Sequence, residues 1–184
     1  MSQPASSVLS HFWSPLCAIG SHGVAGPNAQ ICVSVFGASI VPERPRLLVV
    51  LSNTNFTTGL VAASGTMAIT VLGQGQAELL APLGLRSGRD GTKLAGIAHT
   101  LTTPGDPAFP AGSAGWMATE VLSATSLGDS TAFLTAVRER WDGAAAPLSW
   151  QTAKEVGGDE FLRRWAEKSV REQAAAREAM HWRD

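Results

Sequence analysis

Charged residues are scarce in the first part of this 184-residue chain. Residues 1–85 contain only Glu43, Arg44, Arg46 and Glu78, so 25 of the 29 charged residues lie in the remainder. The totals of 14 basic and 15 acidic side chains nearly cancel. A chain with this balance has little electrostatic attraction for nucleic acid or for an anionic membrane, so we expect neither as a partner.

Long apolar runs are also missing. A helix that crosses a bilayer needs about 18 or more apolar residues, and the longest apolar-rich stretch, residues 47–72, is interrupted repeatedly by serine, threonine and asparagine. The N-terminal sequence MSQPASSVLSHFW has neither the basic start nor the long apolar stretch of a signal peptide. We therefore expect a cytoplasmic protein without a membrane segment.

Metal-binding residues are few and dispersed. Cys17 and Cys32 are the only cysteines, and their separation fits no usual zinc motif. The four histidines are scattered along the chain, so we predict no metal site. A hydrophobic content of 45% with 16% charged residues is typical of a folded domain and not of a disordered chain.

Short β-type runs bounded by glycine, proline and asparagine fill most of the sequence and predict strands. The first hairpin turn is expected at His22-Gly23 or at residues 26–28, and the sequence SLGDS predicts a later one. The expected strands cover residues 16–20, 30–38, 47–52, 67–72, 116–124 and 131–141. Such a series predicts an antiparallel barrel or a sandwich.

Two short helices and one long loop complete this part of the chain. The first helix is expected to begin at an N-cap Thr57 or Thr58 and to end at Gly65, and the second covers residues 76–80. Residues 84–115 are rich in Gly, Pro, Ser and Thr without a sustained period. A loop of this length usually has a function, and we expect it to cover a ligand.

The C-terminal segment has a different character, because residues 154–184 contain 14 charged side chains. We predict a helical tail at residues 151–184, separate from a domain at residues 1–150. Asp159 can cap the helix, and acid-first pairs at i,i+4 spacing favour it. The pairs are Glu160/Arg164 and Glu167/Arg171, and the narrow apolar stripe consists of Phe161, Leu162, Trp165 and Val170.

No motif for nucleophilic catalysis is present. The sequence lacks GxSxG, HExxH, a P-loop and a strand-GxGxxG-helix pattern. Hydroxyl and amide side chains instead gather at residues 52–57, directly before the first expected helix. A helix N-terminus of this kind suits a phosphate, because unpaired N–H groups and the positive end of the dipole face it. The alternative is that Thr57 only caps the helix.

Three sequence blocks in a fixed order resemble the flavin reductase-like family. They are NAQICVSVFGASIVPERPRLLVVLSNTNFTTGLVAASGTMAITVL, then SGRDGTKLAG, then LGDST, and the likeness runs from about Phe12 to Val137. The resemblance implies a mainly β fold with short helices, an antiparallel split β-barrel of the FMN-binding type. The C-terminal helix lies outside the likeness.

The resemblance also implies a set of cofactor-binding residues. The strand that lines the isoalloxazine ring corresponds to Gln30, Ile31, Cys32, Val33 and Ser34, with Asn28 at the strand entry. The phosphate segment corresponds to Asn53, Thr54, Asn55 and Thr57. Arg89 and Lys93 lie in the SGRD segment, where each is either a cation near the phosphate or ring edge or part of a solvated loop.

Two positions depart from the family pattern. Many relatives have Lys or Arg where this chain has Asn53, so phosphate recognition is expected to depend on neutral hydrogen bonds and on Arg89 or Lys93. Many also have histidine, near the flavin and nicotinamide, where this chain has Ser130. The serine puts NAD(P)H oxidation in question more than flavin binding.

The function implied by the resemblance is that of an FMN-binding oxidoreductase, with FAD as the alternative flavin. Hydride would pass from NAD(P)H to flavin N5, and reduced flavin would go to a separate electron acceptor. The cofactor carries this chemistry, so we predict no catalytic side chain. Relatives are homodimers with the flavin near the interface. Two alternatives are a flavin carrier without efficient NAD(P)H oxidation and a split-barrel dimer that binds another small ligand.

Overall fold

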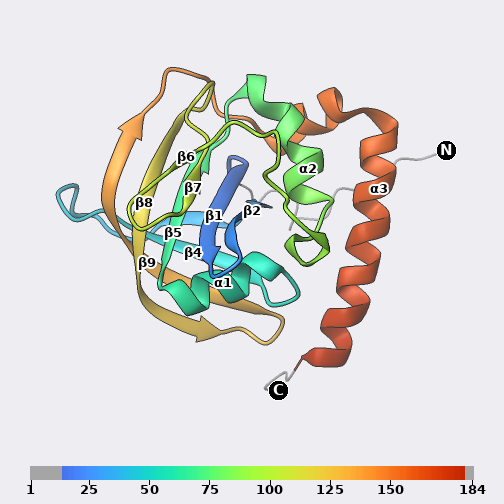
Figure 1. Ribbon diagram of the computed structural model, residues 1–184, viewed down its shortest axis with the longest axis horizontal. Helices are drawn as coiled ribbons and strands as arrows, with labels where there is room; N and C mark the ends of the chain where they lie inside the picture. The colour runs from blue at the N-terminus through green and yellow to red at the C-terminus, as the bar shows by residue number, and fades with distance from the viewer. Residues whose placement is uncertain (1–13, 181–184) are drawn as a thin grey trace.

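A single curled antiparallel sheet forms the body of the protein, as the computed structural model of residues 14–180 shows (Figure 1). Its strand order is β2-β1-β5-β8-β9-β4-β3, with β2 and β3 at the open edges. The strands are β1 (Cys17–Gly23), β2 (Gly26–Cys32), β3 (Val35–Gly37), β4 (Arg46–Ser52), β5 (Thr66–Val71), β8 (Gly115–Ser126) and β9 (Ser130–Asp142). The predicted mainly β split barrel with a C-terminal helix is confirmed.

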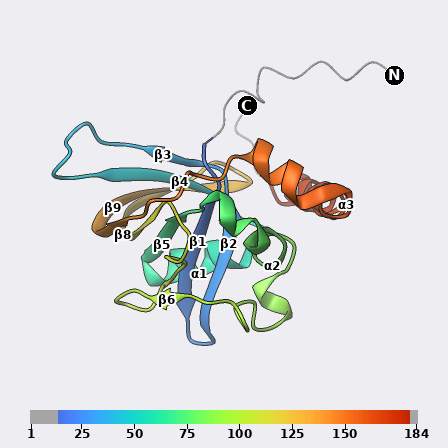
Figure 2. The same cartoon turned by 90° about the horizontal axis from the view of Figure 1, so that it is seen from above.

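Short helices and a two-stranded ribbon surround this half-barrel. The helices are α1 (Phe56–Ser64), η2 (Gln74–Leu79), α2 (Leu80–Gly84), η3 (Gly88–Asp90) and α3 (Trp150–Ala179), and the ribbon pairs β6 (Thr100–Leu101) with β7 (Pro107–Ala108). Helix α3 runs beside α2 on one side of the barrel, while the β3–β4 hairpin projects from the opposite side (Figure 2).

Strand β1 shows one reason why charges are scarce in the first half of the chain. Alternate side chains of a strand point to opposite faces of the sheet. Ala18 contributes to one buried cluster, with Phe109 and the leucines of α2, while Cys17 and Ile19 contribute to another, with Phe133. Because β1 is buried on both faces, neither face of this strand can hold a charge without a partner.

The segment predicted as one strand at residues 30–38 is two strands. Strand β2 ends at Cys32 and pairs with β1, whereas β3 begins at Val35 and pairs with β4. The chain passes between opposite edges of the sheet at this point, and apolar composition alone cannot reveal a change of partner. The first turn also differs from both predicted positions: it consists of Val24 and Ala25, and Gly26 adopts a φ of 106°.

Helix α1 begins earlier than predicted. Its N-cap is Asn55, so Thr57 and Thr58 lie inside the first turn and are buried. The Thr58 hydroxyl donates to the Ser52 carbonyl oxygen at 2.7 Å, which ties the helix start to the end of β4. The predicted stop at Gly65 is confirmed, since this residue has a φ of 71° and its N–H donates to the Val61 carbonyl.

Helix α3 begins before the predicted cap and contains a break. Ser149, not Asp159, is the N-cap, and its Oγ accepts the Thr152 N–H at 3.0 Å. Gly158, with a φ of 69° and a ψ of 177°, interrupts the helix, so that Asp159 begins its second segment. The break redirects the chain, and the second segment runs alongside α2 (Figure 1).

The ion pairs of α3 are not the predicted ones. Arg163, which the prediction ignored, bonds to both Glu160 at 2.8 Å and Glu167 at 2.5 Å, in place of Arg164 and Arg171. The expected apolar stripe is correct for Phe161, Leu162 and Trp165, which pack on the core. It is wrong for Val170, which is 66% exposed.

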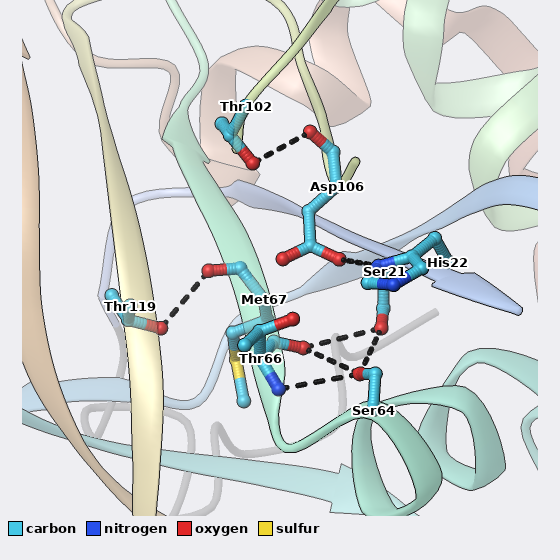
Figure 3. Close-up of polar contacts among 8 residues, drawn as sticks. All are labelled: Ser21, His22, Ser64, Thr66, Met67, Thr102, Asp106 and Thr119. Carbon is cyan, nitrogen blue, oxygen red and sulfur yellow. Dashed lines mark hydrogen bonds and ion pairs between the residues drawn. The ribbon is translucent and has the colours of Figure 1, made fainter. Parts of the chain in front are cut away.

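The long loop between α2 and β8 folds back over β1. The Asp106 carboxylate lies 2.6 Å from His22 Nδ1, and the Asp106 carbonyl accepts the Thr102 hydroxyl (Figure 3). One residue further on, Pro107 passes so close to Gly20 that a Cβ on this glycine would lie 2.0 Å from the Pro107 carbonyl oxygen. The absence of a side chain at residue 20 is therefore what permits this close approach.

Substitution of Gly20 tests how tightly the loop is held. We expect Gly20→Ala to lower the free energy of unfolding by about 1–3 kcal/mol, since the loop or the strand must shift. Gly75→Ala is the control in η2, where nothing lies within 4 Å of the added carbon, and its effect should stay within about 0.5 kcal/mol. Equal urea denaturation midpoints for the two variants would contradict the close packing.

Candidate functional site

A pocket of about 220 Å³ lies between β2, the start of α1, residues 83–93 and α3. Eight of the residues predicted to bind a cofactor line it: Asn28, Gln30, Ile31, Thr54, Asn55, Thr57, Arg89 and Lys93. The structure thus brings together segments that are more than 60 residues apart in the sequence. It gathers part of the strand predicted to line the isoalloxazine ring and most of the predicted phosphate segment around one space.

Four predicted residues lie outside this pocket. The amide side chain of Asn53 bonds to the Gly128 carbonyl at 3.1 Å and to the Thr131 hydroxyl at 2.7 Å, so it ties the α1 entry to the β8–β9 hairpin. Cys32 is buried, Val33 is 42% exposed, and the Ser34 carbonyl accepts the Val50 N–H. All three lie at or beyond the end of β2, where the chain crosses to the other edge of the sheet.

The N-terminus of α1 faces the pocket. Thr54, Asn55, Phe56 and Thr57 are all part of its lining. The first N–H groups of any α-helix lack carbonyl partners within the helix. In α1 the N-cap Asn55 makes no side-chain capping bond, and the first turn contains no acidic residue. This end of the helix therefore presents donors and a positive dipole to an anion.

Two buried amide side chains of β2 form the floor of the pocket. Asn28 Nδ2 donates to Thr57 Oγ1 at 2.8 Å, which leaves the threonine O–H available to donate elsewhere. Gln30 is 5% exposed, and its Oε1 has no hydrogen-bond partner among residues 14–180. A buried acceptor without a donor is costly. A ligand with an N–H or O–H group would remove this cost.

Cationic side chains dominate the electrostatics of the lining. Among the described residues that line the pocket, Arg86, Arg89, Lys93 and Lys168 are basic and Glu172 is acidic. Arg89 Nη1 donates to the Thr54 carbonyl at 2.9 Å, next to the α1 N-terminus. Four cations against one carboxylate is a strong local imbalance in a chain whose net charge is −1. An anion is the ligand that would balance it.

Lys93 is the most deeply buried of these cations. It is 5% exposed, and its Nζ donates to the Ala29 carbonyl at 2.8 Å. Burial, and secondarily the nearby positive charges of Lys168 and Arg86, lower the pKa of the Lys93 ammonium to about 8. The ammonium is therefore held in place by the fold at a cost that an anionic ligand would reduce.

Sequence reasoning missed several lining residues. Arg86, Ser87 and Gly88 directly precede the predicted Arg89, and a Cβ on Gly88 would meet the side chains of Phe56 and Asn28. Trp165, Lys168 and Glu172 come from α3. Their spacing of three and four residues places them on one helix face, and this was the signal that could have found them.

A second cavity adjoins the first. It measures about 580 Å³ and shares Asn28, Phe56, Gly88, Arg89 and Lys93 with it. The β1–β2 turn and residues 91–95 close its other sides, together with His99 from the long loop. The shared residues lie between the two cavities. The first cavity is the more polar one, and the α1 N-terminus faces it.

The described part of the chain has no helix long and apolar enough to span a bilayer. Within residues 14–180 no three His, Cys, Asp or Glu side chains are grouped as metal ligands would be.

Ser130, the residue that departs from the family pattern, begins β9, where its hydroxyl donates to the Asp129 carboxylate at 2.9 Å.

Comparison with known proteins identifies the family. Residues 9–156 match the flavin reductase like domain, so the chain belongs to the flavin reductase-like family. A search of curated proteins gives no significant match.

Solved structures share the fold at low identity. An FMN-binding protein from Thermus thermophilus is 23% identical, with a TM-score of 0.66 over 77% of this chain and 78% of that one. The NADH:FAD oxidoreductase SgcE6 of Streptomyces globisporus is 21% identical, with a TM-score of 0.68 over 76% and 82%. A homolog of nitrilotriacetate monooxygenase component B from Mycobacterium thermoresistibile is 22% identical, with a TM-score of 0.64 over 74% and 73%.

The buried ammonium of Lys93 predicts a pH dependence of stability. Because its pKa falls from 10.5 to about 8 on folding, the unfolded chain binds more protons between these values, and the folded state gains stability as pH rises. Over this range the unfolding free energy of the wild type, minus that of Lys93→Gln, should increase by up to about 3 kcal/mol.

The difference between the two proteins is the quantity to measure, by urea denaturation at several pH values. Burial raises the pKa of Cys32 to about 11 and that of Cys17 further. Both thiols therefore oppose the Lys93 effect at alkaline pH, but they are common to the two proteins and cancel. A difference that does not change between pH 8 and 10.5 would contradict a buried, charged Lys93.

Proposed function

We propose that this pocket binds a flavin nucleotide, FMN or FAD, and that the protein catalyses reduction of the flavin by NAD(P)H. The single observation that carries the proposal is the composition of the lining, in which four cations and the α1 N-terminus face one space. This arrangement suits the phosphate of a flavin nucleotide. Membership in the flavin reductase-like family supports the same assignment.

The residues present fit a flavin at both ends of the pocket. Gln30 Oε1, buried and without a partner in the described chain, can accept an N–H or O–H from the ring or the ribityl chain. Ile31, Leu83, Gly84 and Trp165 provide an apolar wall at the same site. A Cβ on Gly84 would lie 2.5 Å from the Trp165 ring, so no larger residue fits there.

The flavin, when bound, supplies the chemistry, since its N5 accepts hydride from a nicotinamide. The protein's residues bind and orient. Arg89 and the first N–H groups of α1 fix the phosphate, the Thr57 hydroxyl is positioned by Asn28 to donate, and Gln30 selects one orientation of the ring or chain. Positioning of this kind requires no acid or base side chain.

One observation favours a second function, that of a flavin carrier without efficient NAD(P)H oxidation. Ser130 stands where many members of the resembled family have histidine, and its hydroxyl is engaged with Asp129. Flavin that binds but is not reduced by NADH or NADPH would indicate this function. A cytoplasmic setting with access to NAD(P)H, and a separate acceptor for reduced flavin, belong to the main proposal.

The proposed assembly is a homodimer. Four large apolar side chains at and near the β3–β4 hairpin are exposed: Val33, Phe36, Ile40 and Val41, with Ile40 at 99%. Strand β3 is an open edge of the sheet, and the hairpin projects away from the body (Figure 2). Contact with a second copy would cover both the apolar surface and the edge.

Sedimentation equilibrium tests the assembly. We expect the mass of a dimer for the wild type, and a shift toward the monomer for Ile40→Glu, which places a charge in the proposed contact. Glu43→Gln, on the same projecting segment, is the control and should remain dimeric. A wild type that stays monomeric at every concentration would contradict the proposal.

An anaerobic titration with FMN, followed by NADH or NADPH, tests the function. We expect bound flavin whose absorbance is lost on addition of the nicotinamide. Arg89→Gln should weaken FMN binding about tenfold or more, and riboflavin binding much less, because riboflavin has no phosphate. Arg177→Gln, an exposed arginine outside the pocket, removes the same charge and should leave both affinities unchanged.

A further inference from the structure

One continuous stripe runs along the second segment of α3. Phe161, Trp165, Lys168 and Glu172 follow each other at intervals of four, three and four residues, which places them on the same face of a helix. The first two pack against the core, and Trp165 also reaches the pocket. A stripe that served only to attach the helix would remain apolar. Here it becomes charged where it passes the pocket.

The ion pair between Lys168 and Glu172 differs from the other pairs on this helix. Its side chains are 25% and 36% exposed, whereas those of the Arg163 pairs are at least 50% exposed. Its order is also the weaker one for helix stability, since the base precedes the acid at i,i+4. Helix stabilisation is therefore a poor explanation for this pair.

Lys168 faces other cations and not only its own helix. Both Lys168 and Glu172 line the pocket together with Lys93, Arg86 and Arg89. The positive charge of Lys168 contributes to the lowered pKa of Lys93, and Glu172 acts in the opposite direction. Four like charges at a partly enclosed site repel one another, and Glu172 supplies the one carboxylate near them among the described lining residues.

We propose that Lys168 binds the phosphate of the flavin nucleotide, and that Glu172 is its counter-ion when no ligand is present. On binding, the ammonium of Lys168 exchanges the Glu172 carboxylate for the phosphate. The cation lost at Asn53 relative to the family pattern is thus replaced by Lys168, which lies in the part of α3 beyond the family match at residues 9–156. The inference rests on the proposed flavin site and adds a ligand-binding residue to it.

The test compares Lys168→Gln with Arg171→Gln. Both substitutions remove one positive charge from the same helix, but Arg171 is exposed and outside the pocket. The dissociation constants of FMN and riboflavin are measured for each protein by flavin fluorescence. We expect Lys168→Gln to weaken FMN binding about tenfold with riboflavin unchanged. Arg171→Gln should retain the wild-type preference for FMN.

Glu172→Gln provides a change in the opposite direction. Removal of the counter-ion leaves Lys168 free for the phosphate, so FMN should bind about threefold or more tightly while riboflavin is unaffected. If the pair had only a structural role, Lys168→Gln and Glu172→Gln would each weaken the binding of FMN and of riboflavin by the same factor. Circular dichroism and the melting temperature show whether α3 remains folded in each variant.

The outcomes separate this inference from the proposed function. If the wild type binds FMN and Lys168→Gln keeps the preference of Arg171→Gln, the role of Lys168 is overturned and the flavin site stands. If the wild type binds no flavin, the proposed function is overturned. Titration with inorganic phosphate, followed by ³¹P NMR, then decides the inference. Phosphate binding that is lost in Lys168→Gln supports an anion-binding role of Lys168. Phosphate binding that is equal in Lys168→Gln and the wild type, or no phosphate binding by the wild type, overturns that role.

Discussion

An excess of positive charge around one pocket is the constraint that the rest of this structure must accommodate. Arg86, Arg89, Lys93 and Lys168 gather there although residues 1–85 contain only two basic residues. Repulsion among them, and the burial of Lys93, must be offset by the packing of the barrel. A bound anion would relieve this repulsion and would therefore bind favourably, which is why we propose a phosphate site here.

The barrel holds these charges by supplying a rigid, neutral frame. Strand β1 is buried on both faces, and its neighbour β2 presents Asn28 and Gln30 at the open edge of the sheet. Helix α1 follows β4 directly and is fixed by the bond from Thr58 to Ser52. The cations come from segments outside the sheet, two of them from the residues before and within η3. The neutral half and the charged half of the sequence therefore meet at the site.

Most of the fold could be predicted from the sequence, because short apolar runs separated by turn residues specify an antiparallel sheet. The division of residues 30–38 between β2 and β3 could not, since both parts have the composition of a strand and differ only in the partner. The N-cap of α1 is Asn55, two residues before the predicted Thr57. Thr57 has the chemistry of a cap, but Asn28 and burial give its hydroxyl another role.

Site residues could be predicted where they belong to a sequence block that resembles the family. Thr54, Asn55 and Arg89 belong to blocks that resemble the family, and they line the pocket. Asn53 lies in the same block but is engaged with the β8–β9 hairpin, a contact that only the tertiary structure creates. The spacing of Lys168 and Glu172 places them on the helix face of Trp165, but it does not show that this face passes the pocket. That direction depends on the break at Gly158, which only the tertiary structure shows.

A crystal structure of the protein grown with FMN tests the central claim most directly. The account predicts electron density for the phosphate at the N-terminus of α1, within hydrogen-bond distance of the Arg89 guanidinium, and for the flavin beside Gln30. Flavin bound elsewhere, or a phosphate that contacts none of the pocket's cations, would contradict it.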